Sequence, residues 1–380
     1  MMFYRLDRLA SVRRAAENQP AAENPLRPAL DRLRTEADEA LKRPAASVMD
    51  KARAGASGDK HDYYSLGSYW WPDPAKPDGL PYIRRDGQRN PEGSQGDGPA
   101  LGSLLKDAET LALAGFFFRD DRFSRRAAGR LRTWFLDPDT RMNPHLEYGQ
   151  AIPGICTGRD IGIIDTQALR CLPDLLDLLH GDDSLSGEET AAIREWLGTY
   201  LRWLLSSKHG QSEAQQHNNH GTWYDVQVAA LALGTGQTGE ARRVLEAAPE
   251  RRFASQIAPD GSQPHELART LSLSYSAYNL LAMFELATLG EAAGLDLWHW
   301  RGDGGRSLRG ALDFLAPYAD PAKPWQHEQI IDKGRESLLP LLRRGALAFG
   351  EAAYDRCFDQ HPEHAWQRVQ LLWPKADGPR

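Results

Sequence analysis

The sequence of 380 residues has little cysteine, no long apolar run and no excess of basic residues. Its three cysteines, Cys156, Cys171 and Cys357, are too few and too scattered for a disulfide framework or a zinc site, so we expect them in the core. No stretch approaches the roughly 18 consecutive apolar residues of a membrane span. The formal charge is -6, with 46 Lys and Arg against 52 Asp and Glu, whereas nucleic-acid binding needs a strongly basic face. We therefore expect neither a membrane nor a nucleic acid as a partner.

The N-terminal residues 1–20 include arginines but no continuous apolar segment, so they do not read as a secretory signal. The chain as read is expected in the cytoplasm, or in the periplasm or medium if a signal was removed. Hydrophobic residues make up 41% of the sequence, which at so small a net charge is typical of a folded chain with a sizeable core.

Helical periodicity dominates the sequence. Apolar residues recur at helical spacing between residues 122 and 136, and Ser186 with Glu189 forms the capping-box pattern of a helix start. Similar stripes cover residues 101–118, 161–179, 226–233, 273–286 and 338–349. No comparable series of alternating strands is present. The sequence therefore predicts an all-α chain, a single domain over residues 1–380, built as an (α/α) toroid or incomplete barrel of antiparallel helical hairpins.

Residues 60–99 depart from this pattern. Their prolines and glycines exclude a regular helix, but their many aromatic side chains are unlike those of a flexible linker. A long ordered loop on a helical scaffold is typical of a binding site. We expect this loop to line the site and to bind substrate through Tyr69, Trp70, Trp71, Tyr82, Arg84 and Arg85. The alternative is a loop whose aromatic residues pack against its own domain.

The most unusual polar cluster lies in residues 215–225 and includes His217, Asn218, Asn219 and His220. One asparagine would be enough to cap the apolar helix that follows, but seven consecutive polar or glycine positions indicate a functional segment. A metal site would use the two histidines, yet no partner spacing such as HExxH accompanies them. No metal or other cofactor is expected.

A second cluster spans residues 260–279 and continues into a helix. At roughly 100° per residue, Tyr275 lies opposite the apolar stripe of that helix. Ser272, Tyr278 and Asn279 fall near it, so this face carries hydroxyls and amides where a solvated face would carry Lys and Glu. The pattern indicates the wall of a polar cavity, and tyrosines hydrogen-bonded inside a core are the alternative.

Two other patterns carry less weight. The GxGxxG match at residues 234–239 ends a helix and follows no strand, so we interpret it as a helix C-terminus and turn. Carboxylates for a glycoside hydrolase on the same toroid are available, but no spacing selects a pair. These acidic residues are Glu147, Asp160, Asp165, Asp225 and Glu266. A non-catalytic carbohydrate-binding helical protein is a further alternative.

Taken together, several motifs resemble the alginate lyase superfamily, particularly polysaccharide lyase family 38 and more distantly family 5. The matching pieces are YWWPDP at 69–74, GLPYIRRDG at 79–87, NPE at 90–92, NNHG at 218–221, and DGSQ at 260–263 followed by Arg269 and Tyr275. Family 5 places its Arg and Tyr one residue further apart, which favours family 38. The resemblance implies a helical toroid that cleaves uronate polysaccharides by β-elimination.

The resemblance also implies roles for individual residues. Asn219 and Arg269 would bind the substrate carboxylate, His220 would be a catalytic histidine, and Tyr275 would be both base and acid. As further substrate-binding residues we expect Asn218, His265 and Tyr278. The expected partner is an anionic uronate polymer, either polymannuronate-type alginate or glucuronan, bound by a monomer.

The chemistry of β-elimination suits these residue types. Removal of the C5 proton sends charge into the neighbouring carboxylate, and an amide, a guanidinium and an imidazole can stabilise that charge without a metal. A nearby cation would lower the tyrosine pKa from about 10 toward that of a useful base. In mannuronate and glucuronate H5 and O4 lie on the same side, so one tyrosine could serve a syn elimination. Guluronate would need a second residue, which His220 could supply.

The net charge of -6 does not oppose a polyanionic substrate, because the local potential matters more than the total. Basic residues lie in or beside the proposed site segments and could bind successive carboxylates. They are Lys76, Arg84, Arg85, Arg89, Arg159 and Arg269.

Overall fold

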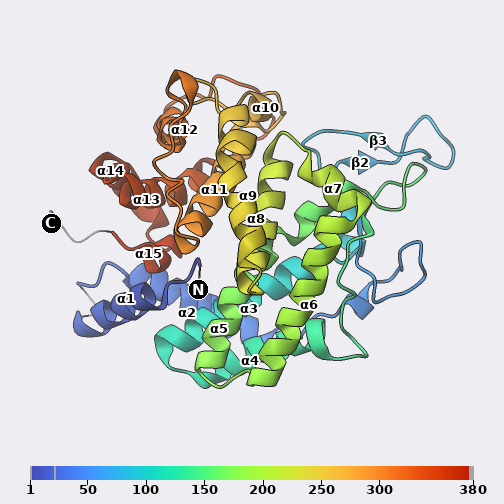
Figure 1. The fold of residues 1–380 in the computed structure, drawn as a ribbon, viewed down its shortest axis with the longest axis horizontal. Helices are drawn as coiled ribbons and strands as arrows, with labels where there is room; N and C mark the ends of the chain where they lie inside the picture. Colours follow the sequence, from blue (N-terminus) through green and yellow to red (C-terminus); the bar gives the residue numbers. More distant parts are fainter. Residues whose placement is uncertain (1, 21–22, 376–380) are drawn as a thin grey trace. The chain divides into compact units, whose positions relative to one another are not determined.

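The computed structural model describes residues 2–20 and 23–375 (Figure 1). Helices make up most of it, and the strands of the described residues are two to four residues long, so the all-α prediction is confirmed. None of the described helices is long and apolar enough to cross a membrane. The predicted domain of residues 1–380 also includes residues 1, 21–22 and 376–380, which lie outside the described residues.

The chain forms two compact units. Unit 1 consists of Met1–Glu36, His217–Val226 and Arg242–Arg380, and unit 2 consists of Ala37–Gln216 and Gln227–Ala241. Three of the described helices, α2 (Arg27–Lys42), α8 (Asn219–Gly234) and α9 (Thr238–Ala248), contribute residues to both units.

Unit 1 is built around a helix that is buried along most of its length. This helix is α11 (Ser272–Ala292), and it packs against α12 (Leu308–Leu315) and α13 (Leu338–Phe349). A buried ion pair joins Arg344 to Glu285 at 2.9 Å. The remaining helices of the unit are α1 (Leu6–Asn18), most of α9 (Thr238–Ala248), α10 (Pro264–Leu267), α14 (Ala352–Asp359) and α15 (Val369–Leu372).

Unit 2 is a second helical core. Its helices are α3 (Gly98–Phe118), α4 (Asp121–Leu131), α5 (Leu172–Gly181), α6 (Gly187–Ser206) and α7 (Lys208–Ala214). Helix α6 begins with the predicted capping box, because Ser186 accepts from the backbone of Glu189 and the Glu189 carboxylate accepts from the backbone of Ser186. Trp134 and Tyr200 are wholly buried in this core.

Most predicted helices are present, with two corrections. The stretch 161–179 contains a 3-10 segment, Asp160–Cys171, before α5, and Pro173 stands in the first turn where a missing N–H is tolerated. The prediction that the cysteines are core residues is wrong, since all three are partly exposed. The predicted turn after residue 234 is confirmed: α8 ends there, and Gly236 has a φ of 78°.

The loop of residues 60–99 is ordered without a regular α-helix until α3 begins at Gly98, as its composition predicts. Strand β1 (Tyr64–Leu66) pairs in parallel with β4 (Tyr148–Ala151). Strand β2 (Trp70–Trp71) pairs antiparallel with β3 (Ile83–Arg84) and forms a short hairpin.

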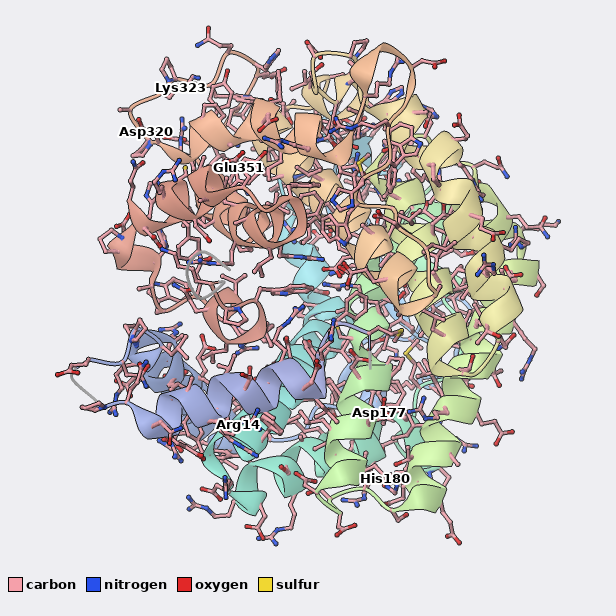
Figure 2. The ribbon with its side chains drawn as sticks, turned by 60° about the vertical axis from the view of Figure 1, so that its left-hand side comes forward. Arg14, Asp177, His180, Asp320, Lys323 and Glu351 are labelled. Atoms are coloured by element: carbon pink, nitrogen blue, oxygen red, sulfur yellow. The ribbon has the colours of Figure 1, made fainter. Side chains whose placement is uncertain are left out.

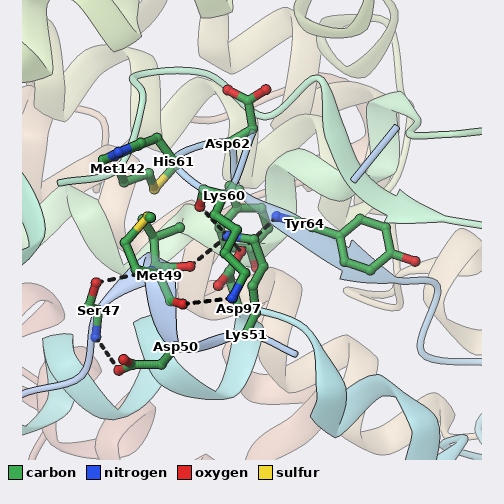
Figure 3. Close-up of polar contacts among 12 residues, drawn as sticks. Ser47, Met49, Asp50, Lys51, Lys60, His61, Asp62, Tyr64, Asp97 and Met142 are labelled. Carbon is green, nitrogen blue, oxygen red and sulfur yellow. Dashed lines mark hydrogen bonds and ion pairs between the residues drawn. The ribbon is translucent and has the colours of Figure 1, made fainter. Parts of the chain in front are cut away.

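A buried ion pair ties the two ends of this loop together (Figure 3). Lys51 Nζ lies 2.9 Å from Asp97 Oδ2, and both side chains are almost wholly inaccessible to solvent. Lys51 also donates to the backbone oxygens of Val48 and Lys60, while the Tyr64 N–H donates to Asp97 at 2.8 Å. Residues at the start and end of the loop therefore share one desolvated cluster.

This burial has a consequence for stability. It raises the pKa of the Asp97 carboxyl to about 6, against the lowering effects of the Tyr64 N–H and the Lys51 ammonium. The folded chain then holds this proton more tightly than the unfolded chain. The contribution of Asp97 to the free energy of unfolding therefore falls as the pH rises from about 4 to about 6.

We expect the stability of the wild-type chain relative to Asp97→Asn to fall by about 2–3 kcal/mol across this pH range, because the variant cannot titrate at this position. Urea unfolding at several pH values measures it. The control is Asp139→Asn, at an exposed carboxylate, measured at the same pH values. A difference between wild type and Asp97→Asn that grows with pH would contradict the prediction.

Candidate functional site

The N-terminus of α8 is capped by Asn218. Its side-chain oxygen accepts from the backbone N–H of His220 at 3.2 Å, and its backbone oxygen accepts from Thr222 at 3.3 Å. Of the two asparagines, Asn218 is therefore the N-cap, which was the alternative interpretation of this pair. The side-chain oxygen of Asn218 is bonded to the first turn of α8. Asn219 and His220 follow in the first turn.

Asn219 is held by a buried carboxylate, that of Glu266 on α10. The Asn219 backbone N–H donates to Glu266 Oε1 at 2.7 Å, and the amide nitrogen lies 3.0 Å and 2.8 Å from the two carboxylate oxygens. Each residue is only 1% exposed. Since a buried carboxylate requires donors, this pair fixes both the orientation of the Asn219 amide and the approach of α10 to α8.

The electrostatics of Glu266 tie it to three of the predicted catalytic residues. Burial raises the pKa of its carboxyl, whereas the Asn219 donors and the nearby charges of Arg269 and His220 lower it. The sequence left Glu266 as one of five acidic residues with no role. Its position three residues before Arg269 was the available signal, but only the fold shows that its carboxylate meets Asn219.

Arg269 and Tyr275 are in direct contact. Arg269 lies in the turn between α10 and α11, and its guanidinium carbon is 3.9 Å from the centroid of the Tyr275 ring. Both side chains are half-buried, and Tyr275 occupies the first turn of α11. A cation over the ring is attracted to the π-system and also favours negative charge on the phenol oxygen.

Two histidines of unit 1 lie side by side. The rings of His217 and His265 are 4.7 Å apart, and both residues are exposed. Although His265 is exposed, partial desolvation of its ring by the surrounding atoms, together with the nearby His217, lowers its pKa. Among the residues that the structure describes, no group of three His, Cys, Asp or Glu side chains is placed to hold a metal ion.

The polar face of α11 differs from the predicted cavity wall. Ser272 and Asn279 are wholly buried, and the Asn279 amide donates to Gln256 and Gln263 at 2.8 Å each. The cavity interpretation is therefore wrong for these two residues, because neither side chain is accessible to solvent or to a ligand. Only the tyrosines of this face are partly exposed, and Tyr278 packs 4.9 Å from the buried Trp223 ring.

In unit 2, the aromatic residues of the loop are partly packed and partly accessible. Trp71 donates its indole N–H to the backbone of Gln88 at 2.9 Å, and the Arg85 guanidinium lies 5.2 Å from the Trp71 ring. The Arg85 N–H donates to the backbone oxygen of Tyr69 at 2.8 Å. Arg84 is exposed and forms an ion pair with Asp86 at 2.8 Å.

Tyr82 is fixed in the same loop. Its hydroxyl donates to Glu92 at 2.6 Å, and burial together with this carboxylate raises the pKa of Tyr82 to about 12. The phenol is therefore protonated at neutral pH and unsuited to be a base. Tyr69, Trp70, Trp71 and Tyr82 lie on or directly beside the β2–β3 hairpin, and their binding of substrate stays a prediction.

A buried network behind the loop positions a further cation. Arg159 donates to Gln150 at 2.7 Å and lies 5.9 Å from the Trp70 ring. Gln150 has the unusual φ of 50° for a residue other than glycine and donates to Asp165 at 2.9 Å. Ser65 donates to the same carboxylate at 2.6 Å. The sequence identified Arg159 only as a basic residue near the site. Trp70 is remote from it in the chain, and its contact with Gln150 depends on the unusual backbone conformation of that residue.

Comparison with solved structures gives close and distant relatives. An alginate lyase from Bacteroides ovatus has 40% sequence identity and a TM-score of 0.92, with 98% of each chain covered. Alginate lyase A1-III from Sphingomonas species A1 has 15% identity and a TM-score of 0.54, with 90% of this chain and 94% of that chain covered. A variant of A1-III complexed with a tetrasaccharide has 16% identity and a TM-score of 0.57, with 91% and 95% covered. A search of curated proteins found no match.

The A1-III structures are too distant in sequence to show more than the fold. Their likeness confirms the predicted fold class, an all-α, α/α-barrel-like arrangement. The division into one domain over the whole chain stays a prediction.

The alginate lyase family matches residues 47–325, well over half of the chain. This range includes both polar clusters and the aromatic loop. Neither a glycoside hydrolase nor a non-catalytic binding protein agrees with this match and with the close Bacteroides relative. The chain belongs to the alginate lyase family and is a polysaccharide lyase.

Proposed function

We propose that this lyase cleaves 1,4-linked uronate polymers of the alginate type by metal-independent syn β-elimination, acting as a monomer. The observation that carries the proposal is the guanidinium of Arg269 stacked 3.9 Å from the Tyr275 ring. The names of the similar structures support an alginate-type substrate, and one of them holds a tetrasaccharide. The spacing of Arg269 and Tyr275 supports membership of polysaccharide lyase family 38.

In this mechanism the Tyr275 phenolate takes the C5 proton of the sugar. The electron pair left on C5 delocalises into the adjacent carboxylate and then forms the C4=C5 double bond as the C4–O4 bond breaks. The departing oxygen receives the proton back from the Tyr275 hydroxyl. No proton or electron is gained or lost by the enzyme, so no redox partner is required.

The substrate carboxylate needs donors that are in place before the charge develops. Arg269 would supply the guanidinium and His220 an imidazole. Asn219 would supply an amide N–H, and Glu266 orients that amide through its contacts of 2.7–3.0 Å. The amide nitrogen is bonded to both Glu266 oxygens in this structure, so one of its two hydrogens would have to leave Glu266 to bind the substrate carboxylate.

Other residues would bind sugars away from the bond that breaks. The half-buried rings of Tyr69, Trp70, Trp71 and Tyr82 suit the apolar faces of sugars, and Arg84 with Arg85 suits their carboxylates. In unit 1, His265 and Tyr278 are partly accessible and are proposed to contact the substrate, as is Asn218.

A syn elimination by one tyrosine favours mannuronate or glucuronate over guluronate, in which H5 and O4 lie on opposite faces. Ultraviolet absorbance of the new double bond, measured on polymannuronate, polyguluronate and glucuronan, tests both the reaction and the substrate. We expect absorbance to rise with polymannuronate or glucuronan. Cleavage of polyguluronate alone would contradict the single-tyrosine mechanism.

Replacement of the base tests the central assignment. We expect Tyr275→Phe to lower kcat by about 10²–10⁴-fold, because it removes base and acid together while the ring stays on Arg269. Tyr278→Phe, on the same helix, is the comparison: as a proposed substrate contact it should raise KM and leave kcat close to that of wild type. Near-normal turnover of Tyr275→Phe, with loss in Tyr278→Phe, would move the base to Tyr278.

Removal of metal tests the second part of the proposal. Dialysis against a chelator should leave kcat unchanged, because amide, guanidinium and imidazole donors stabilise the carboxylate. Activity is followed by absorbance before and after dialysis. A complete loss that one divalent ion restores would instead make His217 and His220 the candidate ligands.

The loop is tested at Arg84. We expect Arg84→Ala to raise KM several-fold with little change in melting temperature, because an exposed ion pair such as that with Asp86 contributes about 0–1 kcal/mol. The control is Arg122→Ala, which breaks a similar exposed pair with Asp120. Equal KM values for the two variants would favour a loop that packs only on itself.

A further inference from the structure

The first turn of α11 carries Tyr275 but has no cap of its own. The residue before the helix is Leu271, whose side chain cannot accept a hydrogen bond. The first four N–H groups of any helix lack partners within it, and Ser, Thr, Asp or Asn normally satisfies some of them. The sequence around residue 271 therefore predicts a frayed start, at the place where the proposed base must be held still.

A distant part of the chain pairs with this turn. We call residues 325–333 the capping segment. Leu271 and Gln329 form an antiparallel bridge, the Ser272 N–H donates to Glu328 O at 3.2 Å, and the Ile330 N–H donates to Thr270 O at 2.9 Å. These bonds lie between Arg269 and Tyr275 in the sequence, so the capping segment runs along the turn that separates the two.

The side chain of Gln329 takes the place of the missing cap. Its oxygen accepts from the Leu273 N–H at 3.1 Å, as an N-cap side chain would accept from the second residue of a helix. Its amide nitrogen donates to Ser274 Oγ at 3.2 Å and to the backbone oxygens of Ile331 and Lys333 at 2.9 and 3.1 Å. The amide nitrogen therefore fixes the position of the Gln329 side chain, and the amide oxygen binds the first turn of α11.

A tryptophan holds the other end of the capping segment. Trp325 donates to Ser272 Oγ at 2.7 Å, and this hydroxyl donates to Glu328 O at 2.6 Å. The Trp325 ring packs 4.6 Å from Tyr318. The turn that leads into the segment is closed by the Lys323 N–H, which donates to Asp320 O at 3.1 Å; both residues are labelled in Figure 2.

We infer that Gln329 is a positioning residue for Tyr275, acting as a helix cap supplied from 56 positions beyond the first turn of α11. The inference rests on the proposed role of Tyr275 as base. With the cap in place, the Tyr275 N–H bonds Leu271 O at 3.0 Å and the ring stays against Arg269. Without it, the first turn loosens and the phenol oxygen is no longer held at the distance that proton transfer requires.

The test compares Gln329→Met with Gln326→Met. Methionine keeps the length of the side chain but has neither the acceptor for Leu273 nor the donor for Ser274. Gln326 lies in the same segment, is exposed and donates within its own loop to Pro324 O. For Gln329→Met we expect kcat on the uronate polymer to fall about tenfold or more, with KM within about twofold of wild type, as is typical of a displaced catalytic group. Gln326→Met should keep both constants.

A second variant guards against misfolding. Ser274→Ala removes one partner of the Gln329 amide and keeps the cap itself, so it should lower kcat in the same direction but less. The double variant Gln329→Met with Tyr275→Phe should be no slower than Tyr275→Phe alone, because the hydroxyl that the cap positions is already absent.

The outcomes separate this inference from the proposed function. If Tyr275→Phe is inactive and Gln329→Met matches Gln326→Met in kcat, the positioning role fails and the base assignment stands. If Gln329→Met lowers the melting temperature but leaves kcat unchanged below that temperature, Gln329 is only structural and the inference is overturned. If Tyr275→Phe is fully active, the base assignment itself fails.

Discussion

A carboxylate removed from solvent must be met by donors, and Glu266 meets this requirement with Asn219. The backbone and side-chain N–H groups of Asn219 lie 2.7–3.0 Å from its oxygens, and both residues are 1% exposed. Removal of either partner would leave a buried charge or a buried donor without its bond. The pair therefore joins α8 to α10 and fixes the amide beside Arg269, from which the rest of the candidate site in unit 1 follows.

The contact between Arg269 and Tyr275 extends this constraint to α11. Arg269 comes two residues after the end of α10, so the position of its guanidinium depends on where Glu266 holds that helix. The position of the Tyr275 ring depends instead on the first turn of α11. That start is held by Gln329 rather than by a local cap. In unit 2 a comparable device ties the aromatic loop, where a desolvated ion pair between Lys51 and Asp97 joins its two ends. In each unit, buried polar contacts fix a segment that carries partly exposed side chains: the start of α11 in unit 1 and the aromatic loop in unit 2.

Much of the fold could be predicted because helices follow local periodicity. The capping box of Ser186 and Glu189, the buried length of α11 and the absence of a regular α-helix between residues 60 and 97 are all readable from neighbouring residues. The cysteines and the polar face of α11 could not be placed in this way. Burial of Asn279, for example, depends on Gln256 and Gln263, which belong to other elements and supply its acceptors.

The sequence by itself determined the helical class and the two polar clusters and, through resemblance, proposed Asn219, Arg269 and Tyr275 as site residues, because these depend on residue type and spacing. Only the tertiary structure decided which carboxylate holds Asn219 and which side chain caps the helix of Tyr275. Glu266 lies 47 positions from Asn219, and Gln329 lies 56 positions from Leu273. Spacing over such lengths carries no signal, since hydrogen bonds between distant segments exist only after the helices have packed.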